Sequence, residues 1–581
     1  MNRTMVKLLG KYLKGFLKEA TIGPAFKLTE AVFELIVPLV MAQIIDVGVA
    51  NGDTGYVLRM GGVMILLGVV GLCCALVCQY FASKASQGVG TVMRNDMFRH
   101  ISTLSHAEID RIGTPSLINR ITNDVNQLQT AVAMLIRLVI RAPFLVIGAT
   151  VMAISIDWKM SGIFLVAMVL IALALYLIMS RSIPFFKVVQ RLLDKISLIT
   201  RENLEGVRVI RAFSRQETEK TRFSEACEEQ SNTAIRVGKL SALLNPLTYI
   251  IVNLAIVAII WFGGYQVDGG ELTQGKLIAL VNYMTQIMLA MVVVANLVVI
   301  FTRAAASAAR VNEIFSVQSS IVPGEKEVQA VSGTPRVEWK DVSFAYMGSE
   351  EYALEHVTLS VAAGETVGVI GGTGAGKSTL VNLIPRFYDV SEGALLVDGV
   401  DVREYPFAQL RTQIGVVPQR AVLFSGTIRE NMKWGDKNAS DEQIWHALDI
   451  AQASEFVKKL PEGLDYQILQ GGKNLSGGQK QRLTIARALV GSPKILVLDD
   501  SASALDFATD AALRRAIRRQ TQDMTVFMVS QRANTVKNAD KIVVLDDGEV
   551  AGIGTHGDLF ESCEVYREIC LSQLSAEEAS R

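Results

Sequence analysis

Two kinds of hydrophobic pattern divide the chain. Up to about residue 315, apolar runs recur that reach the roughly 20 residues a bilayer-spanning helix needs. From about residue 336, short β-branched runs alternate with helical stretches, which is typical of an α/β domain with a largely parallel sheet. The sequence therefore predicts an all-α membrane domain over 1–315, a polar linker over 316–335 and an α/β domain over 336–581. Its six predicted spans cover 24–46, 57–82, 134–156, 160–180, 244–267 and 277–302.

Positive charge orients these spans. The stretch 181–240 holds twelve Lys and Arg residues, whereas the short turns between paired spans hold almost none beyond Lys159 and Lys276. The positive-inside rule then places both termini and the long connections, about 83–133 and 181–243, in the cytoplasm. These connections are helical in pattern, so we expect the membrane helices to extend beyond the bilayer. Each would turn back at a short tip helix, at 114–122 and 204–213.

Composition excludes some classes of protein. The 581 residues are 50% hydrophobic and 20% charged, with a mean hydropathy of +0.32. A soluble protein carries about 25% charged residues, so this chain is too apolar to be a wholly soluble protein. Lys+Arg and Asp+Glu number 57 each, so no global field attracts nucleic acid. The six cysteines form no disulfide framework.

The first 20 residues have the pattern of a basic amphipathic helix. Such a helix lies on the cytoplasmic membrane surface or, alternatively, is solvated.

A phosphate-binding motif lies early in the α/β half. GGTGAGKST fits G-x-x-x-x-G-K-[ST] and stands between a predicted strand and a predicted helix, which is the context the motif needs. Glycines let backbone N–H groups surround phosphates, and the helix start adds its positive end. Lys377 would reach the β and γ phosphates of ATP, and the Ser378 hydroxyl would bind Mg²⁺. The predicted ATP-binding residues of this motif are Gly371, Gly372, Thr373, Gly374, Ala375, Gly376, Lys377, Ser378 and Thr379.

An acidic strand end complements this motif. KILVLDD, residues 494–500, is a buried apolar strand that ends in two carboxylates. Asp499 is placed to hold Mg²⁺, as the strand-borne acid of P-loop NTPases does. Alone this pattern is weak, but together with the phosphate-binding motif it predicts a nucleotide site.

A third motif brings in a family resemblance. LSGGQ, made of Leu475, Ser476, Gly477, Gly478 and Gln479, lies between the other two motifs. This order resembles the nucleotide-binding domain of ABC transporters, and the whole chain resembles a half-transporter of the exporter type. The resemblance implies that Tyr346 stacks on adenine and that Gln419 touches Mg²⁺. It also implies that a loop crosses to a partner, formed by Ser503, Ala504, Leu505 and Asp506. The tips at 114–122 and 204–213 then fall where the family has its coupling helices.

The signature also implies a second chain. A serine and two glycines at a helix start form an anion site. In the family, that site closes over ATP bound to a second nucleotide-binding domain. This chain has one phosphate-binding motif and one signature, so the resemblance implies an obligate dimer with a second half-transporter.

Two residues depart from the family pattern at the catalytic site. Asp500 stands where the family has the Glu that orients the attacking water, and its carboxylate is pulled back by about 1.5 Å. A misplacement of about 1 Å can cost about 10²-fold in rate. Gln531 stands where the family has a His on the γ-phosphate, and glutamine carries no positive charge. Gln470 is a softer departure, since many exporters carry Glu there. The combination resembles the degenerate-site subunit of bacterial heterodimeric multidrug exporters; a slow homodimer is the alternative.

The cargo is less well defined by the sequence. Arg137 and Arg141 at the start of the third span favour either an anionic or amphipathic cargo or contact with the membrane interface. Polar residues in the fifth and sixth spans line a cavity or bridge helices: Tyr249, Asn253, Asn282, Tyr283, Gln286 and Asn296.

These observations together predict a function. We expect ATP-driven export of a lipophilic or amphipathic compound, a small molecule or a peptide, across the bacterial cytoplasmic membrane, with contact to lipids and none to nucleic acid. The alternatives are import on the same fold and an ATP-gated regulatory subunit or channel.

Overall fold

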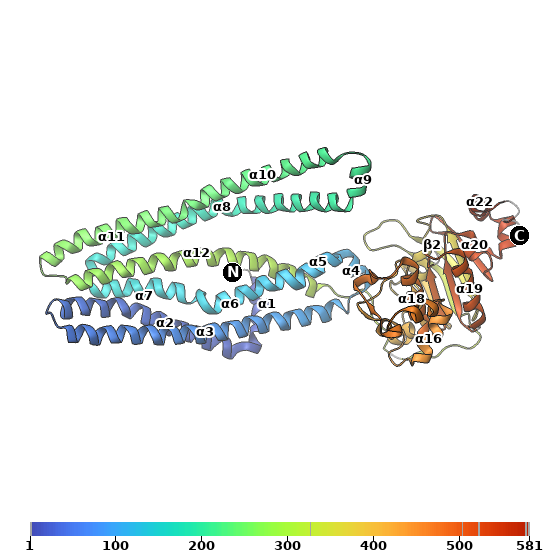
Figure 1. The fold of residues 1–581 in the computed structure, drawn as a ribbon, viewed down its shortest axis with the longest axis horizontal. Helices are drawn as coiled ribbons and strands as arrows, with labels where there is room; N and C mark the ends of the chain where they lie inside the picture. Colours follow the sequence, from blue (N-terminus) through green and yellow to red (C-terminus); the bar gives the residue numbers. More distant parts are fainter. Residues whose placement is uncertain (1–2, 326, 502–503, 521–522, 576–577, 579–581) are drawn as a thin grey trace. The chain divides into compact units, whose positions relative to one another are not determined.

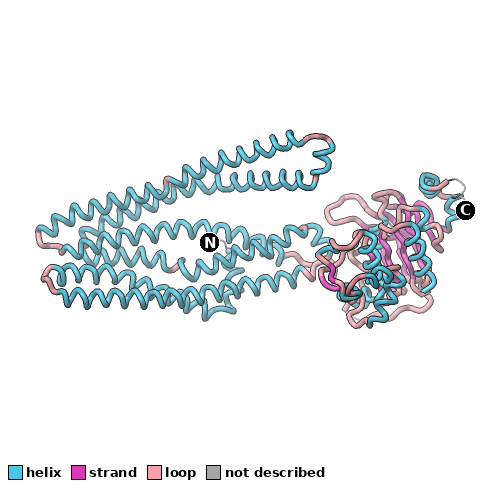
Figure 2. Tube along the Cα trace, in the orientation of Figure 1, coloured by secondary structure: helices cyan, strands magenta, loops and turns pink. Residues whose placement is uncertain are grey.

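The chain divides into two units of different architecture. In the computed structural model, all residues are described except 1–2, 326, 502–503, 521–522, 576–577 and 579–581. The first unit comprises Met1–Ser102 and Pro115–Ser316, and the second comprises Thr103–Thr114 and Val317–Arg581. The first is helical and the second combines helices and strands (Figures 1 and 2).

The first unit is built from long helices. Six continuous helical stretches are long and apolar enough to cross a membrane, which confirms the six predicted spans: Arg3–Val49, Thr54–Ile101, Thr114–Ile156, Trp158–Glu205, Gln216–Asp268 and Gln274–Ser316. Their helices are α1 (Arg3–Leu13), α2 (Leu17–Gln43), α3 (Thr54–Ile101), α5 (Thr114–Asn119), α6 (Val125–Met134), α7 (Arg141–Ile156), α8 (Trp158–Glu205), α9 (Val207–Ala212), α10 (Gln216–Ala242), α11 (Leu244–Asp268) and α12 (Gln274–Ser316). Turns of π-helix interrupt these stretches at Ile44–Val49, Arg120–Asp124 and Leu135–Val139.

A proline on α2 explains one of two polar contacts between α12 and α2. Pro38 has no N–H to donate to the carbonyl of Glu34, one turn earlier. The side-chain amide of Gln286 donates to that carbonyl at 3.1 Å, and the Tyr283 hydroxyl donates to the next carbonyl, of Leu35, at 2.6 Å. Tyr283 and Gln286 therefore bridge α12 to α2, and the Gln286 amide satisfies the carbonyl that Pro38 leaves free, since a free backbone carbonyl in an apolar bundle needs a donor.

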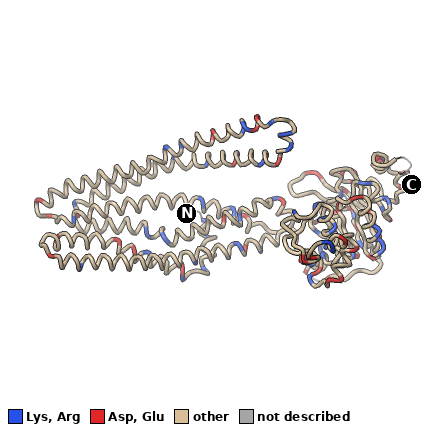
Figure 3. Tube along the Cα trace, viewed as in Figure 1, with Lys and Arg blue, Asp and Glu red and all other residues tan. Residues whose placement is uncertain are grey.

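An ion pair lies in the same region of the bundle. Arg141 on α7 donates to Glu34 on α2 at 2.7 Å. The Arg141 guanidinium therefore has a carboxylate partner on a neighbouring helix of the same bundle. Long stretches of these helices carry few charged residues, whereas the connection around α9 carries many (Figure 3). The tip helix expected at 204–213 is confirmed as α9, Val207–Ala212, which joins α8 to α10 (Figure 1).

The other tip helix was wrongly placed. The short helix is α4 (His106–Ile112), and the expected stretch 114–122 instead begins the returning helix with α5. A capping box starts α4: the Ser105 N–H donates to Glu108 at 3.0 Å, and the Ser105 side chain accepts from the helix. Gly113 ends it with a φ of +81°, which glycine adopts without strain. The sequence analysis overlooked this S-x-x-E signal.

Helix α4 belongs to the second unit. Its His106 ring lies 4.6 Å from the ring of Phe387, and the Tyr388 hydroxyl donates to Asp110 at 2.9 Å. The other helices of this unit are α13 (Lys377–Asn382), α14 (Phe407–Thr412), α15 (Ile428–Met432), α16 (Asp441–Ile450), α17 (Ser454–Lys459), α18 (Gly477–Val490), α19 (Phe507–Gln520), α20 (Ala533–Val536), α21 (His556–Ser562) and α22 (Glu564–Gln573).

Three sheets organise the second unit. The largest has the order β12-β11-β3-β10-β9-β6 and is parallel except for β12 at its edge, so the largely parallel sheet is confirmed. A second, antiparallel sheet has the order β2-β1-β4-β5, and β7 pairs with β8. The strands are β1 (Val337–Phe344), β2 (Leu354–Val361), β3 (Thr366–Gly371), β4 (Glu392–Val397), β5 (Val400–Asp401), β6 (Ile414–Val417), β7 (Gly426–Thr427), β8 (Gln467–Ile468), β9 (Ile495–Asp499), β10 (Thr525–Val529), β11 (Lys541–Asp546) and β12 (Glu549–Gly554).

This topology positions the predicted motifs. β3, β9 and β10 are adjacent and parallel, so their carboxyl ends meet at one edge of the sheet. Such an edge is where α/β sheets bind ligands. Buried apolar residues on both faces hold these strands; the Trp339 and Phe527 rings, for example, meet edge to face at 5.7 Å. The phosphate-binding motif follows β3, and the two carboxylates follow β9.

Candidate functional site: a nucleotide cavity

A cavity of about 290 Å³ opens at this edge of the sheet. Residues from five separate segments line it: Tyr346, Ala353, Thr373, Gly374, Gly376, Lys377, Ser378, Thr379, Gln419, Asp499, Asp500, Val529, Ser530 and Gln531. The structure thus brings together the phosphate-binding motif, the strand acids and both departures from the family pattern.

The phosphate-binding loop requires its glycines. Gly374 and Gly376 have φ values of +89° and +87°, in the left-handed region that other residues adopt rarely. A Cβ on Gly376 would lie 2.5 Å from the carbonyl oxygen of Ala353. The loop leads directly into α13, which begins at Lys377. Backbone N–H groups therefore converge on the cavity at the positive end of a helix.

Lys377 is buried, with 7% of its surface exposed. Its ammonium donates to the carbonyl of Gly371 at 3.0 Å and to that of Gly372. Burial lowers the pKa of Lys377, and the carboxylates of Asp500 and Asp499 oppose this effect. A cation held here by neutral carbonyls can turn toward phosphate oxygens, which are stronger acceptors.

The predicted magnesium ligands lie together. The Ser378 hydroxyl donates to Asp499 Oδ1 at 2.9 Å, and Gln419 lines the same cavity. Burial raises the pKa of Asp499, while the hydrogen bond from Ser378 lowers it. All three side chains offer oxygen, which Mg²⁺ prefers, and Mg²⁺ sites with nucleotides take few protein ligands. The residues present therefore fit Mg²⁺ bound together with phosphates.

An aromatic cluster forms the other end of the cavity. The Tyr346 hydroxyl lies 3.0 Å from Thr379 Oγ1, and its ring meets Phe344 and Tyr388 edge to face at 4.9 and 5.4 Å. Tyr346 keeps 39% of its surface exposed, so a ring face remains for a base. Tyr388 was missed by the sequence analysis, because nothing in its neighbours along the chain links it to Tyr346.

The two departing residues occupy one edge of the cavity. Asp500 has a φ of +44°, which aspartate tolerates better than most residues, and its N–H donates to Val529 at 3.0 Å. Its carboxylate lies 3.5 Å from the Gln419 amide. The main-chain carbonyl of Gln531 accepts from Gln573 at 2.8 Å. The backbone of Asp500 is thus anchored to the end of β10.

The signature lies elsewhere. Ser476 caps α18 through a capping box with Gln479: each backbone N–H donates to the other's side chain, at 2.9 and 3.3 Å. Leu475 is buried and anchors the loop, and Gly478 approaches Ala504 so closely that a Cβ would lie 3.3 Å from its carbonyl. Among the described residues, none of Leu475 to Gln479 lines the cavity.

The predicted crossing loop is described in part. Ser503 lies outside the described residues. Leu505 is buried, and Asp506 accepts from the backbone and side chain of Thr509 at 2.9 and 2.8 Å at the start of α19. Gln470 lies in a short 3-10 turn, outside the cavity lining.

Comparisons with known proteins identify the family. The chain matches the ABC transporter transmembrane region over residues 21–291 and the ABC transporter family over residues 354–503. This chain is an ABC transporter. It is 39% identical over 575 residues to an uncharacterized ABC transporter ATP-binding protein of Mycobacterium tuberculosis, covering 98% of each chain. The domain order is that of an exporter-type half-transporter, and its second unit is an ATPase domain.

Two further relatives extend this assignment. An ATP-dependent lipid A-core flippase of Vibrio vulnificus is 30% identical over 569 residues, covering 97% of this ABC transporter and 96% of the flippase. The structure of a bacterial Atm1-family ABC exporter with ATP bound has the same fold, with a TM-score of 0.78 and 24% identity, covering 99% of this chain and all of that one. Exporters of this class act as dimers of half-transporters in a membrane, so this multi-pass protein needs a second half.

Proposed function

We propose that this ABC transporter is one subunit of a heterodimeric exporter and that its own nucleotide site binds MgATP but hydrolyses it slowly. The observation that carries this proposal is the cavity itself. Lys377, Ser378 and Asp499 keep the groups that hold a nucleotide, while Asp500 and Gln531 line the same cavity at its catalytic edge.

Each residue has a distinct role in this proposal. The loop from Gly371 to Thr379 and the Tyr346 ring hold ATP, and Ser378, Gln419 and Asp499 hold Mg²⁺. Bound Mg²⁺ would neutralise charge on the phosphates. Asp500 orients the attacking water from too far back, and Gln531 offers a neutral hydrogen bond to the γ-phosphate where a cation is needed.

The signature supports the need for a partner. Ser476, Gly477 and Gly478 form an anion site that lies outside the cavity of their own chain. In the proposed dimer, this signature completes the partner's competent site, and the loop from Ser503 to Asp506 crosses to that partner. Hydrolysis then takes place mainly at the partner's phosphate-binding loop.

The decisive experiment restores the family residues. Mg-ATP hydrolysis is measured for the purified chain in nanodiscs, beside Asp500→Glu/Gln531→His. We expect negligible turnover of the wild type and a rise of about 10²-fold in the double variant, because a misplacement of about 1 Å costs that much. The matched control, Asp546→Glu/Gln520→His, makes the same changes at exposed positions outside the cavity. Brisk wild-type turnover would instead indicate a self-sufficient homodimer.

We further propose that the cargo is lipophilic or amphipathic and leaves the bacterial cytoplasm. Inside the bundle, the charges of Arg141 and Glu34 compensate each other, and so do those of Lys27 and Glu30 at 2.6 Å. Such a membrane half suits an apolar cargo better than a strongly charged one, and a related chain is a flippase of lipid A-core. Transport into inverted membrane vesicles tests the direction: cargo uptake into these vesicles means export, and cargo loss from them would favour an importer.

A further inference from the structure

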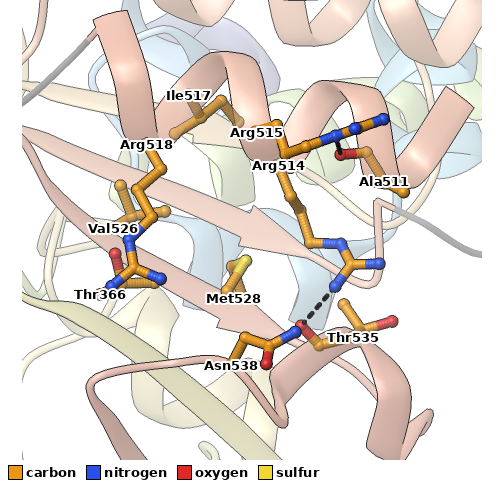
Figure 4. Close-up of a pocket in the computed structure, with 10 residues that line it drawn as sticks. All are labelled: Thr366, Ala511, Arg514, Arg515, Ile517, Arg518, Val526, Met528, Thr535 and Asn538. Carbon is orange, nitrogen blue, oxygen red and sulfur yellow. Dashed lines mark hydrogen bonds between the residues drawn. The ribbon is translucent and has the colours of Figure 1, made fainter.

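We propose that the second unit carries a binding pocket for a small organic anion, separate from the nucleotide cavity. The pocket lies between α19 and β10, encloses about 350 Å³, and is drawn in Figure 4. Three arginines of α19 line it: Arg514, Arg515 and Arg518. In the described part of the chain, none of its lining residues also lines the nucleotide cavity.

The floor of the pocket is apolar. Ile517, Val526 and Met528 are buried beneath it, with 8% or less of their surface exposed. In Figure 4 the Met528 side chain lies at the centre, with Arg518 on one side and Arg514 and Asn538 on the others. A methionine floor accepts flat apolar groups of varied shape, because its thioether is flexible and polarizable.

The rim offers hydrogen-bond donors that the fold does not use up. Arg518 pairs with Asp540 at 3.2 Å through one nitrogen, and among the described residues its other nitrogens have no acceptor. Within the described ranges, Arg515 donates only its Nε, to the Ala511 carbonyl at 3.2 Å. Arg514 is tied to Asp510 at 2.9 Å and to the Asn534 carbonyl at 3.0 Å, yet its buried Nε has no partner in the described part of the chain.

Charge points to an anion. The rim carries three guanidinium groups, and only two carboxylates of the same chain pair with them: Asp510 with Arg514 and Asp540 with Arg518, among the described residues. The rim is therefore net positive. Guanidinium groups match carboxylates and phosphates, to which they donate two parallel hydrogen bonds. A volume near the lower end of the usual range of about 300–1,000 Å³ suits a metabolite more than a lipid. The ligand class is therefore a carboxylate or phosphate monoester on a flat apolar body.

Binding of benzoate and phenyl phosphate to the full chain in nanodiscs tests this inference. Saturation-transfer NMR is run with saturating MgATP, so that the phosphate-binding loop is occupied. We expect binding of at least one probe, and at least a tenfold rise in its Kd in Arg518→Gln and in Arg515→Gln. Arg519→Gln removes a neighbouring exposed charge that does not line the pocket, and should change the Kd less than twofold.

Several results would overturn the proposal. These are the absence of binding by either probe, equal effects of Arg518→Gln and Arg519→Gln, and equally tight binding of neutral benzyl alcohol. Probe binding that is seen only when MgATP is left out would also contradict it, since that places the probe in the nucleotide cavity. Thermal unfolding of each variant verifies that both arginine changes leave the unit folded.

Discussion

Two helices of the second unit begin at glycine-rich loops, and they differ in what surrounds them. The loop before α13 faces a cavity completed by β9, β10 and the Gln419 segment of the same chain. The start of α18 consists of a capping serine and two glycines, Ser476, Gly477 and Gly478, and among the described residues none of these three lines the nucleotide cavity. Both starts favour anions for the same reason. The two helix starts therefore differ in enclosure: other elements of the same chain surround the start of α13, and a helix start needs such elements to become a nucleotide site.

The largest effect should come from the self-contained site. Lys377→Ala should raise the Kd for ATP of the isolated chain by about 100-fold, because it removes two charge-assisted hydrogen bonds worth about 1.5 kcal/mol each. Equilibrium binding of a fluorescent ATP analogue measures this. Lys473→Ala, at an exposed position near the signature, serves as the control and should leave the Kd unchanged. Unaltered binding in Lys377→Ala would mean that the cavity does not hold the phosphates.

The second effect concerns the signature and appears only in the dimer. Ser476→Ala should lower the Mg-ATPase rate of the assembled transporter by about 30-fold, because one donor to the partner's γ-phosphate is lost. The ATP affinity of the isolated chain should not change.

A matched serine separates this effect from stability. Ser440 caps α16 through the same capping box, with Gln443. Ser440→Ala and Ser476→Ala should each reduce the free energy of unfolding by about 1 kcal/mol, and only Ser476→Ala should reduce ATPase activity. Equal activity losses in the two variants would remove the distinction between the two helix starts.

The smallest effect sharpens the description of the self-contained site. Tyr346→Ala should raise the Kd for ATP about tenfold, since stacking of a base on an aromatic ring is worth about 1–3 kcal/mol. Tyr346→Phe keeps the ring and loses only the hydroxyl contact with Thr379, so its Kd should rise less than threefold. Isothermal titration of the isolated chain compares them. Similar losses in both variants would show that the hydroxyl, and not the ring, matters.

Much of the fold could be predicted from local patterns. The six apolar stretches and the strands around the motifs follow from hydrophobic periodicity, which acts over a few neighbouring residues. The first tip helix was misplaced because the capping box of Ser105 and Glu108 starts a short helix, α4, before the stretch 114–122 whose helical pattern was used for the prediction. The antiparallel sheet of β2, β1, β4 and β5 was also missed, since its strands pair across long separations.

The phosphate-binding motif and the acidic strand end could be recognised from residue spacing along the chain, whereas the signature and the departures at Asp500 and Gln531 could be recognised only from the resemblance to a family. Which of these groups line one cavity depends on the tertiary structure. Lys377, Asp499 and Asp500 converge because β3, β9 and β10 are parallel neighbours, whereas the signature remains outside their cavity. The tertiary structure also places the Tyr388 ring against the Tyr346 ring and brings three arginines into one pocket with Met528. The physical reason is that such contacts depend on how distant segments pack, which no local pattern of residues encodes.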